Sequence, residues 1–396
     1  MNRFTTLLAQ AWRQLLLAIG LLVALGFLML WRITTAPKNF SLQELATKSN
    51  SFSWHKIWHN PINAPFTALE RVSFLLFHPT SAIAIRLTPA IFGGATIILF
   101  YSILRFWFDT KTAILGSSLL ACTSWFLSFA RTNTPDILFM SILLLIGCSL
   151  WIKHSLHRNP ILLLSAIIAG GSIYIPGMIW FLLIGAVWRW RSIQRELSRT
   201  KIWIRVLAVI MVVALVLPLG YAVYKQPSNI WTILGLPSHA PTVLTILRNF
   251  GDSVRSIFYN APFNPAHTVG HQPVFGVFMD AMFFLGVYQL WRYQSLDRSR
   301  ILIGVTLIGL VLTGFGVVSV AVLLPSLYLV VTLGIIYMLD LWYSVFPNNP
   351  IARTVGMTML TLAVIFACTY QLRRYFVAWP NSPTTAAVFS HKDLPT

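Results

Sequence analysis

Long apolar segments recur along the whole chain. Residues 14–31 carry no charged side chain. A helix needs about 20 predominantly apolar residues to cross the hydrocarbon core of a bilayer. Comparable segments predict further spans at 83–104, 112–130, 136–152, 160–174, 177–190, 206–224, 273–292, 301–315, 317–338 and 354–371. No small-x-small cleavage site follows the first segment, so we expect it to remain. The pattern predicts an all-α polytopic membrane protein with about eleven transmembrane helices.

Lysine and arginine concentrate in short segments on one predicted side of the membrane: Arg105, Lys111, Lys153, Arg158, the run from Arg189 to Arg205, Arg292, Arg298 and Arg300. The positive-inside rule makes that side, with the N-terminus, cytoplasmic in a plasma (inner) membrane. An odd number of spans then places the longer polar segments 32–82, 225–272 and the tail on the extracytoplasmic face. We interpret residues 1–372 as one transmembrane domain and 373–396 as a polar C-terminal tail, loosely ordered from Trp379 onward.

Two outer segments have the spacing of short amphipathic helices. Trp54, Ile57 and Trp58 fall at i, i+3 and i+4 in the first outer loop. Residues Leu247 to Ile257 repeat this apolar spacing in the second. Both are predicted to be interfacial helices that lie flat on the membrane.

Composition excludes a water-soluble protein. The chain is 57% hydrophobic and 10% charged, with a mean hydropathy of +0.72. Its net charge of +19 lies largely in short loops between spans, where it meets membrane lipids, so nucleic acid is not an expected partner. No Walker-type loop or GxSxG elbow is present. Any reaction must therefore use an activated substrate that reaches the outer leaflet.

The chain has only ten acidic residues, so those on the predicted outer face are informative. Glu44 ends the sequence Ser-Leu-Gln-Glu, which is also the spelling of a helix capping box. Asp136 follows a proline at the start of a span, where a helix N-terminus stabilises a carboxylate whether or not it does chemistry. Arg86 and Arg131 lie at predicted outer helix ends. They could bind phosphate, pair with Glu44 or Asp136, or extend to the interface.

Two histidine pairs have i, i+4 spacing. His55 and His59 lack a third ligand at a diagnostic distance, so we predict no metal site there. His267 and His271 lie in a loop that contains proline and glycine, where they could donate hydrogen bonds to an anionic ligand.

Three further motifs carry a resemblance to a known family: Asn63-Ala-Pro-Phe, Arg86-Leu-Thr-Pro-Ala-Ile-Phe-Gly and Ala130-Arg131-Thr-Asn-Thr-Pro135-Asp136. In order and spacing they resemble polyprenyl-phosphate-sugar glycosyltransferases of the GT-C class. The most similar groups are the protein O-mannosyltransferases and the aminoarabinose-transferase-like enzymes, which are glycosyltransferase family 39-like. The resemblance covers about residues 10–190.

This resemblance implies an inverting transfer of a sugar from a polyprenyl-phosphate donor to a lipid, glycan or protein acceptor on the extracytoplasmic face. It requires a carboxylate base and cations on the departing phosphate, but no cofactor and no obligatory metal. We expect Glu44 to be the base and Asp136 to be a second catalytic carboxylate that orients the acceptor. The substrate-binding candidates are Arg86, Arg131, Lys48, Asn63, His267 and His271.

The chain departs from the family at two positions. Relatives usually carry Asp-Glu early in the first outer loop, where this chain has Gln43-Glu44, and often histidine at the position of Asn63. The change at Gln43 keeps open a catalytically silent relative that binds polyprenyl phosphate or acts as a scaffold. A lipid or sugar transporter is a further alternative, although no repeated halves are evident.

Overall fold

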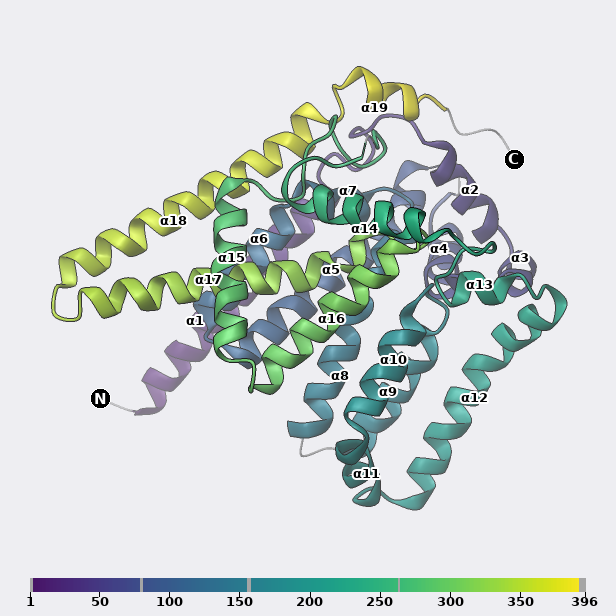
Figure 1. Ribbon diagram of the computed structural model, residues 1–396, viewed down its shortest axis with the longest axis horizontal. Helices are drawn as coiled ribbons and strands as arrows, with labels where there is room; N and C mark the ends of the chain where they lie inside the picture. Colours follow the sequence, from purple (N-terminus) through teal and green to yellow (C-terminus); the bar gives the residue numbers. More distant parts are fainter. Residues whose placement is uncertain (1–2, 79–80, 155–157, 263, 392–396) are drawn as a thin grey trace.

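The computed structural model describes residues 3–78, 81–154, 158–262 and 264–391 of the chain (Figure 1). Within these ranges the secondary structure is helical, apart from a single antiparallel bridge between Phe40 and His391. The predicted all-α fold is confirmed.

The first part of the chain contains a long helix, three helices of the predicted first outer loop and the first half of the bundle. Its elements are α1 (Arg3–Leu30), α2 (Leu42–Ser51), α3 (Trp54–His59), α4 (Ala64–Leu76), α5 (Ala82–Trp107), α6 (Thr110–Cys122), α7 (Ser124–Arg131), the 3-10 helix η1 (Pro135–Ser141), α8 (Ile142–His154), α9 (Arg158–Ser172), α10 (Met178–Trp188), α11 (Trp190–Ser198) and α12 (Ile202–Lys225).

The second part completes the bundle and ends in the C-terminal segment. Its elements are α13 (Asn229–Ile233), α14 (Val243–Phe258), α15 (Val277–Arg292), α16 (Asp297–Gly314), η2 (Val320–Val322), α17 (Leu324–Val345), α18 (Pro350–Arg373), the π-helical turn η3 (Arg374–Ala378) and α19 (Pro383–Val388).

Four helical segments of the described chain are long and apolar enough to cross a membrane: 82–107, 202–225, 320–345 and 350–378. The α6–α7 pair, bent by 68°, gives a fifth if it is one span. All eleven predicted segments fall on helices, and shorter apolar helical stretches lie at 18–30, 135–148, 159–172 and 178–188. The multi-pass membrane architecture is confirmed, whereas the count of eleven stays a prediction.

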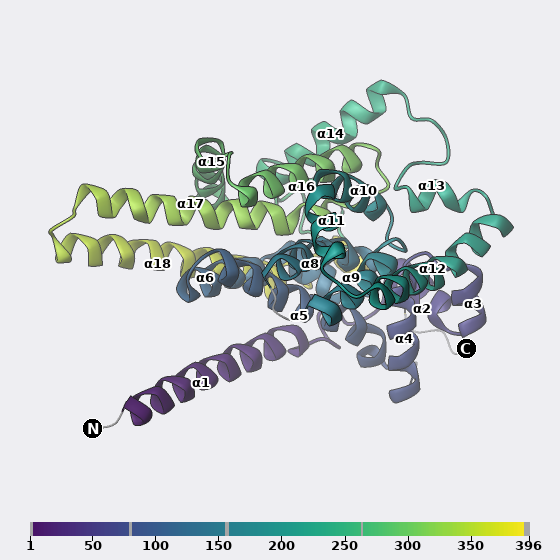
Figure 2. The same ribbon diagram turned by 90° about the horizontal axis from the view of Figure 1, so that it is seen from below.

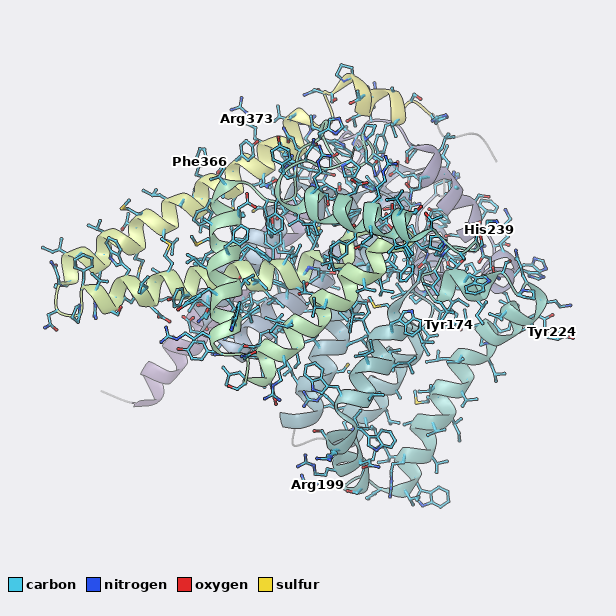
Figure 3. The ribbon with its side chains drawn as sticks, in the orientation of Figure 1. Tyr174, Arg199, Tyr224, His239, Phe366 and Arg373 are labelled. Carbon is cyan, nitrogen blue, oxygen red and sulfur yellow. The ribbon has the colours of Figure 1, made fainter. Side chains whose placement is uncertain are left out.

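The two most exposed spans are α12 and α18. Helix α12 lies at the edge of the molecule in Figure 1, and α18 projects beside the end of α17 in Figures 1 and 2. Only 17% of the apolar window of α12 and 11% of that of α18 is buried, against 83% for the window that contains α17. Phe366 points outward from α18 in Figure 3 and is 75% exposed. In a membrane these apolar surfaces face lipid.

Two glycines allow α15 and α17 to pack closely at the centre. A Cβ atom at Gly334 would lie 1.7 Å from the carbonyl oxygen of Met282, and one at Gly286 would lie 2.0 Å from that of Val330. No larger residue fits without moving the backbone. Such small residues at helix crossings are typical of membrane bundles.

Both expected amphipathic outer segments form helices, α3 and α14. On α3, Ile57 is buried, whereas Trp54 and Trp58 are exposed on the surface. On α14, Ile257 is buried and Leu247 is exposed. Their positions on a membrane surface stay predictions.

The C-terminal tail differs from expectation up to His391. Trp379 and Phe389 are buried against each other, and Trp379 donates a hydrogen bond from Nε1 to the carbonyl of Pro265 at 3.1 Å. The expectation of a loosely ordered chain is wrong here. These aromatic side chains pack into the hydrophobic core, although the tail around them in the sequence is mostly polar. Residues 392–396 lie outside the described residues, and the domain boundary at residue 372 stays a prediction.

Candidate active site

Helix α2 begins where the sequence predicts it, and its first turn buries Glu44. Ser41 and Glu44 form both hydrogen bonds of a capping box, each at 3.1 Å. The Glu44 side chain is completely buried and turns toward α5. The capping role that the sequence left open is therefore present.

Glu44 and Arg86 form a buried ion pair. Nε of Arg86 donates to Oε1 of Glu44 at 3.0 Å, and Nη2 donates to Oε2 at 3.2 Å. The backbone N–H of Asn133 and that of Ser41 supply one further donor to each oxygen, at 3.0 and 3.1 Å. Four donors occupy the lone-pair positions of an ionised carboxylate. This carboxylate has no free position from which to accept a substrate proton.

The other donors of Arg86 are also occupied. They bond to three backbone carbonyls of the segment after α1: Ile33 at 3.0 Å, Pro37 at 2.6 Å and Asn39 at 2.8 Å. The guanidinium carbon also lies 5.2 Å from the ring centre of Phe40. Arg86 thus fastens the first outer segment to the start of α5. The geometry does not favour a role on the donor phosphate.

Asn133 connects this ion pair to a second buried acid, Glu70 of α4. Its side-chain amide donates to Oε1 of Glu70 and, at 3.3 Å, to the backbone carbonyl of Glu44. Ser51 donates its hydroxyl to the other oxygen of Glu70. Burial raises the pKa of Glu70 to about 7, and Ser51, Asn133 and nearby Lys48 oppose that rise. These contacts hold the segment before Asp136 in place.

The predicted site did not include Glu70 or Asn133. Glu70 had a signal in its scarcity, as one of ten acids and one on the predicted outer face. Asn133 lies inside the third family-like motif but has no local pattern of its own. The contact between them joins residues 63 positions apart, which no spacing rule detects.

Glu70 should make stability depend on pH. Its pKa is higher in the fold than its ordinary value of 4.5, so the folded protein binds more protons and loses stability as pH rises from about 4.5 to about 7. Glu70→Gln can still accept from Asn133 and donate to Ser51, and it does not titrate. We expect the decline in the free energy of unfolding to be smaller by about 3 kcal/mol in the variant than in the parent. Thermal unfolding in detergent from pH 4.5 to 8 measures it.

The exposed acid Asp340 supplies the control for that measurement. Asp340→Asn should keep the pH dependence of the parent protein. Parallel curves for Glu70→Gln and the parent would show that Glu70 does not titrate in this range.

Asp136 differs from Glu44 in its surroundings. It lies in η1, its side chain is 21% exposed, and Oδ2 is 3.9 Å from Nε2 of His267. Within the described ranges its carboxylate accepts no hydrogen bond. Burial lowers the pKa of His267 to about 4, so at neutral pH this ring is uncharged. The ring packs on Phe129 with centroids 4.7 Å apart, which fixes its orientation beside Asp136.

The loop that precedes Asp136 has unused polar atoms. Nε of Arg131, Oδ1 of Asn133 and Oγ1 of Thr134 are buried and have no hydrogen-bond partner in the described part of the chain. Arg131 otherwise donates to the carbonyls of Leu28 and Trp31. Buried polar atoms without partners are rare in folded proteins, so these three are candidates for contact with a ligand.

The remaining candidates divide into two groups. Lys48 is buried on α2 near Glu70, within the same polar cluster. Asn63 has a left-handed φ of 59° in the turn before α4, and its N–H donates to the carbonyl of Tyr174, which is labelled in Figure 3. His271 contacts the Ala261 carbonyl through Nδ1 at 3.0 Å. These contacts of Asn63 and His271 stabilise the loops in which the two residues lie. Their substrate-binding roles stay predictions.

The described residues contain no group of three or more His, Cys, Asp or Glu side chains that could hold a metal ion. The structure therefore brings together two neighbouring features: the buried cluster of Glu44, Arg86, Glu70 and Asn133, and the partly exposed Asp136 carboxylate beside the buried ring of His267. The catalytic roles of Glu44 and Asp136 stay predictions, and the geometry favours Asp136 as the base.

Comparisons with known proteins agree with the sequence motifs. Residues 61–221 match the family model described as dolichyl-phosphate-mannose-protein mannosyltransferase. No curated protein matches the chain. The fold is similar to that of ArnT from Cupriavidus metallidurans in the apo state, with a TM-score of 0.56 and 14% sequence identity over 96% of this chain and 78% of that chain. The resemblance to the GT-C class is confirmed.

Proposed function

We propose, from the premise that residues 61–221 match a mannosyltransferase family and that the fold is that of ArnT, that this chain is a membrane glycosyltransferase that uses a lipid-linked sugar. In the finer form of the proposal, the donor is a polyprenyl-phosphate sugar, and the acceptor is a lipid, glycan or protein on the extracytoplasmic face. The transfer inverts the anomeric carbon.

The observation that carries this proposal is the state of the Asp136 carboxylate. It is accessible, accepts no hydrogen bond in the described chain, and lies beside a neutral imidazole. In the proposed step, Asp136 takes the proton of an acceptor hydroxyl while the hydroxyl oxygen attacks the anomeric carbon. The bond from that carbon to the phosphate oxygen breaks, and polyprenyl phosphate leaves with the electron pair.

The other groups assist in different ways. The ring of His267 lies beside the Asp136 carboxylate, with Nε2 3.9 Å from Oδ2, and bounds it on one side. Arg131 keeps a buried Nε–H without a partner in the described chain, and we assign it to the developing charge on the phosphate. Glu44 and Arg86 act earlier, by fixing the outer segment on which the site is built.

The proposed orientation places this site outside the cytoplasm of a plasma (inner) membrane, with the N-terminus inside and the tail outside. In Figure 3, Arg199 lies beside α11 at the opposite end of the molecule from Arg373. The basic segment from Arg189 to Arg205 would then face the cytoplasm, as the positive-inside rule requires.

The direct test is a transfer assay with purified protein in liposomes. We expect the chain to move labelled sugar from polyprenyl-phosphate mannose or polyprenyl-phosphate aminoarabinose to an extracted envelope acceptor. The product should appear only with the lipid-linked donor, and released polyprenyl phosphate should equal the sugar transferred.

The same assay separates the alternatives. Donor binding without product would support the silent relative that Gln43 suggests, because this exposed residue replaces the usual aspartate. Movement of intact donor across the bilayer without transfer would support a transporter. Either result would contradict the enzyme proposal.

A further inference from the structure

A cavity lies at the opposite end of α5 from the candidate active site. Arg86 and Trp107 are twenty-one residues apart on this helix, which at a rise of about 1.5 Å per residue is roughly 30 Å. This is about the thickness of the hydrocarbon core of a bilayer. The cavity has a volume of about 400 Å³, and its walls come from the ends of α5 and α8, from Arg189 after α10 and from the start of α16.

The inner wall of this cavity is apolar and continues along the bundle. Phe106 and Leu150 line the cavity and also a narrow crevice between α5 and α8. Leu99 and Ile103 form one side of that crevice, and Gly147 lies on the other. A Cβ atom at Gly147 would meet no atom within 4 Å, so the crevice is open at this point. The crevice has a volume of about 10 Å³, so the largely apolar wall that it shares with the cavity continues along α5 and α8 toward Gly147.

The mouth of the cavity carries two arginines. Arg298 is fixed by a hydrogen bond from Nη1 to the carbonyl of Trp107 at 3.4 Å and by the ring of Phe108, 5.0 Å from its guanidinium carbon. The Arg189 side chain makes no hydrogen bond or ion pair in the described part of the chain. Asp297 also lines the cavity, so the two arginines and this acid give the cavity a formal charge of +1. The cavity therefore attracts a single anionic group.

We propose that this cavity binds an anionic phospholipid of the leaflet opposite the active site. Its phosphate lies between Arg189 and Arg298, and an acyl chain lies along the apolar wall of Phe106 and Leu150, which leads toward Gly147. A charged mouth joined to an apolar path matches a headgroup joined to a hydrocarbon chain, and basic pockets between spans at this depth bind acidic lipids. This proposal does not depend on the glycosyltransferase proposal.

Binding of dioleoyl phosphatidylglycerol to the full chain in detergent tests the proposal, by native mass spectrometry and thermal shift. The protein should bind this lipid in preference to dioleoyl phosphatidylcholine. Arg189→Gln with Arg298→Gln should weaken binding about thirtyfold, since each arginine near a membrane surface contributes roughly a factor of five. Asp297→Asn should strengthen it, because the variant removes the negative charge from the same cavity.

Two further variants keep the test independent of folding and of general charge. Gly147→Ala places a methyl group in the crevice, where a Cβ atom would meet no atom within 4 Å, raises helix propensity and should weaken lipid binding without loss of thermal stability. Arg191→Gln with Arg195→Gln removes the same charge from neighbouring α11 and should leave binding unchanged.

Three outcomes would overturn the proposal. They are equal binding of both phospholipids, equal weakening by the two double variants, and displacement of phosphatidylglycerol by inorganic phosphate at concentrations comparable to those of the lipid. The last result would mean that the cavity holds a free anion instead of a lipid.

Discussion

Asp136→Asn is expected to reduce sugar transfer by about 10²- to 10⁴-fold, the range over which a positioned general base contributes. Asparagine has nearly the shape of aspartate, so the contact with His267 and the fold of η1 should persist. The loss should appear in kcat, while donor affinity changes little. Single-turnover transfer in liposomes and donor binding to the same preparation measure the two quantities separately.

The matched control is Asp252→Asn, which removes another acid of the predicted outer face, on α14. Its transfer rate should equal that of the parent protein. Full activity in Asp136→Asn would remove Asp136 as the base. A parallel loss of donor binding would instead show that this carboxylate positions the donor.

Local sequence patterns predicted the helices well. Apolar segments such as 206–224 need no partner to be identified, because the membrane itself selects them. The capping box at Ser41 and Glu44 is an equally local pattern, and the structure contains it at these residues. The C-terminal tail was mispredicted because three of its aromatic residues, Tyr375, Trp379 and Phe389, are buried in the core although the tail as a whole is polar. Average composition does not show where single side chains pack.

The sequence predicted which residues lie in the candidate site better than it predicted what each of them does. The sequence placed Glu44 and Arg86 on the same face and left their pairing open. It could not show that Arg86 is occupied by the carbonyls of Ile33, Pro37 and Asn39, because backbone groups leave no mark in a sequence. The sequence likewise could not show that the carboxylate of Glu44 accepts four hydrogen bonds whereas that of Asp136 accepts none in the described chain.

Arg86→Met is expected to lower the free energy of unfolding by about 3–5 kcal/mol. The variant leaves Glu44 buried and charged without its partner, and loss of one member of a buried ion pair costs about this amount. It also removes the donors that bind three carbonyls of the first outer segment. Denaturant titration in detergent, followed by tryptophan fluorescence, measures the change. Arg105→Met, on the exposed other end of α5, is the control and should be close to neutral.

The double variant Glu44→Leu with Arg86→Met distinguishes a structural ion pair from a catalytic carboxylate. Without either charge, the buried site no longer holds an unpaired ion, so the loss of stability should be smaller than the sum of the two single changes. Glu44→Gln should then lose stability and activity together, because Arg86 keeps a poorer acceptor in place of a carboxylate. If Glu44→Gln instead abolished transfer at unchanged stability, Glu44 would be the base after all, and its four hydrogen bonds would have to rearrange when the donor binds.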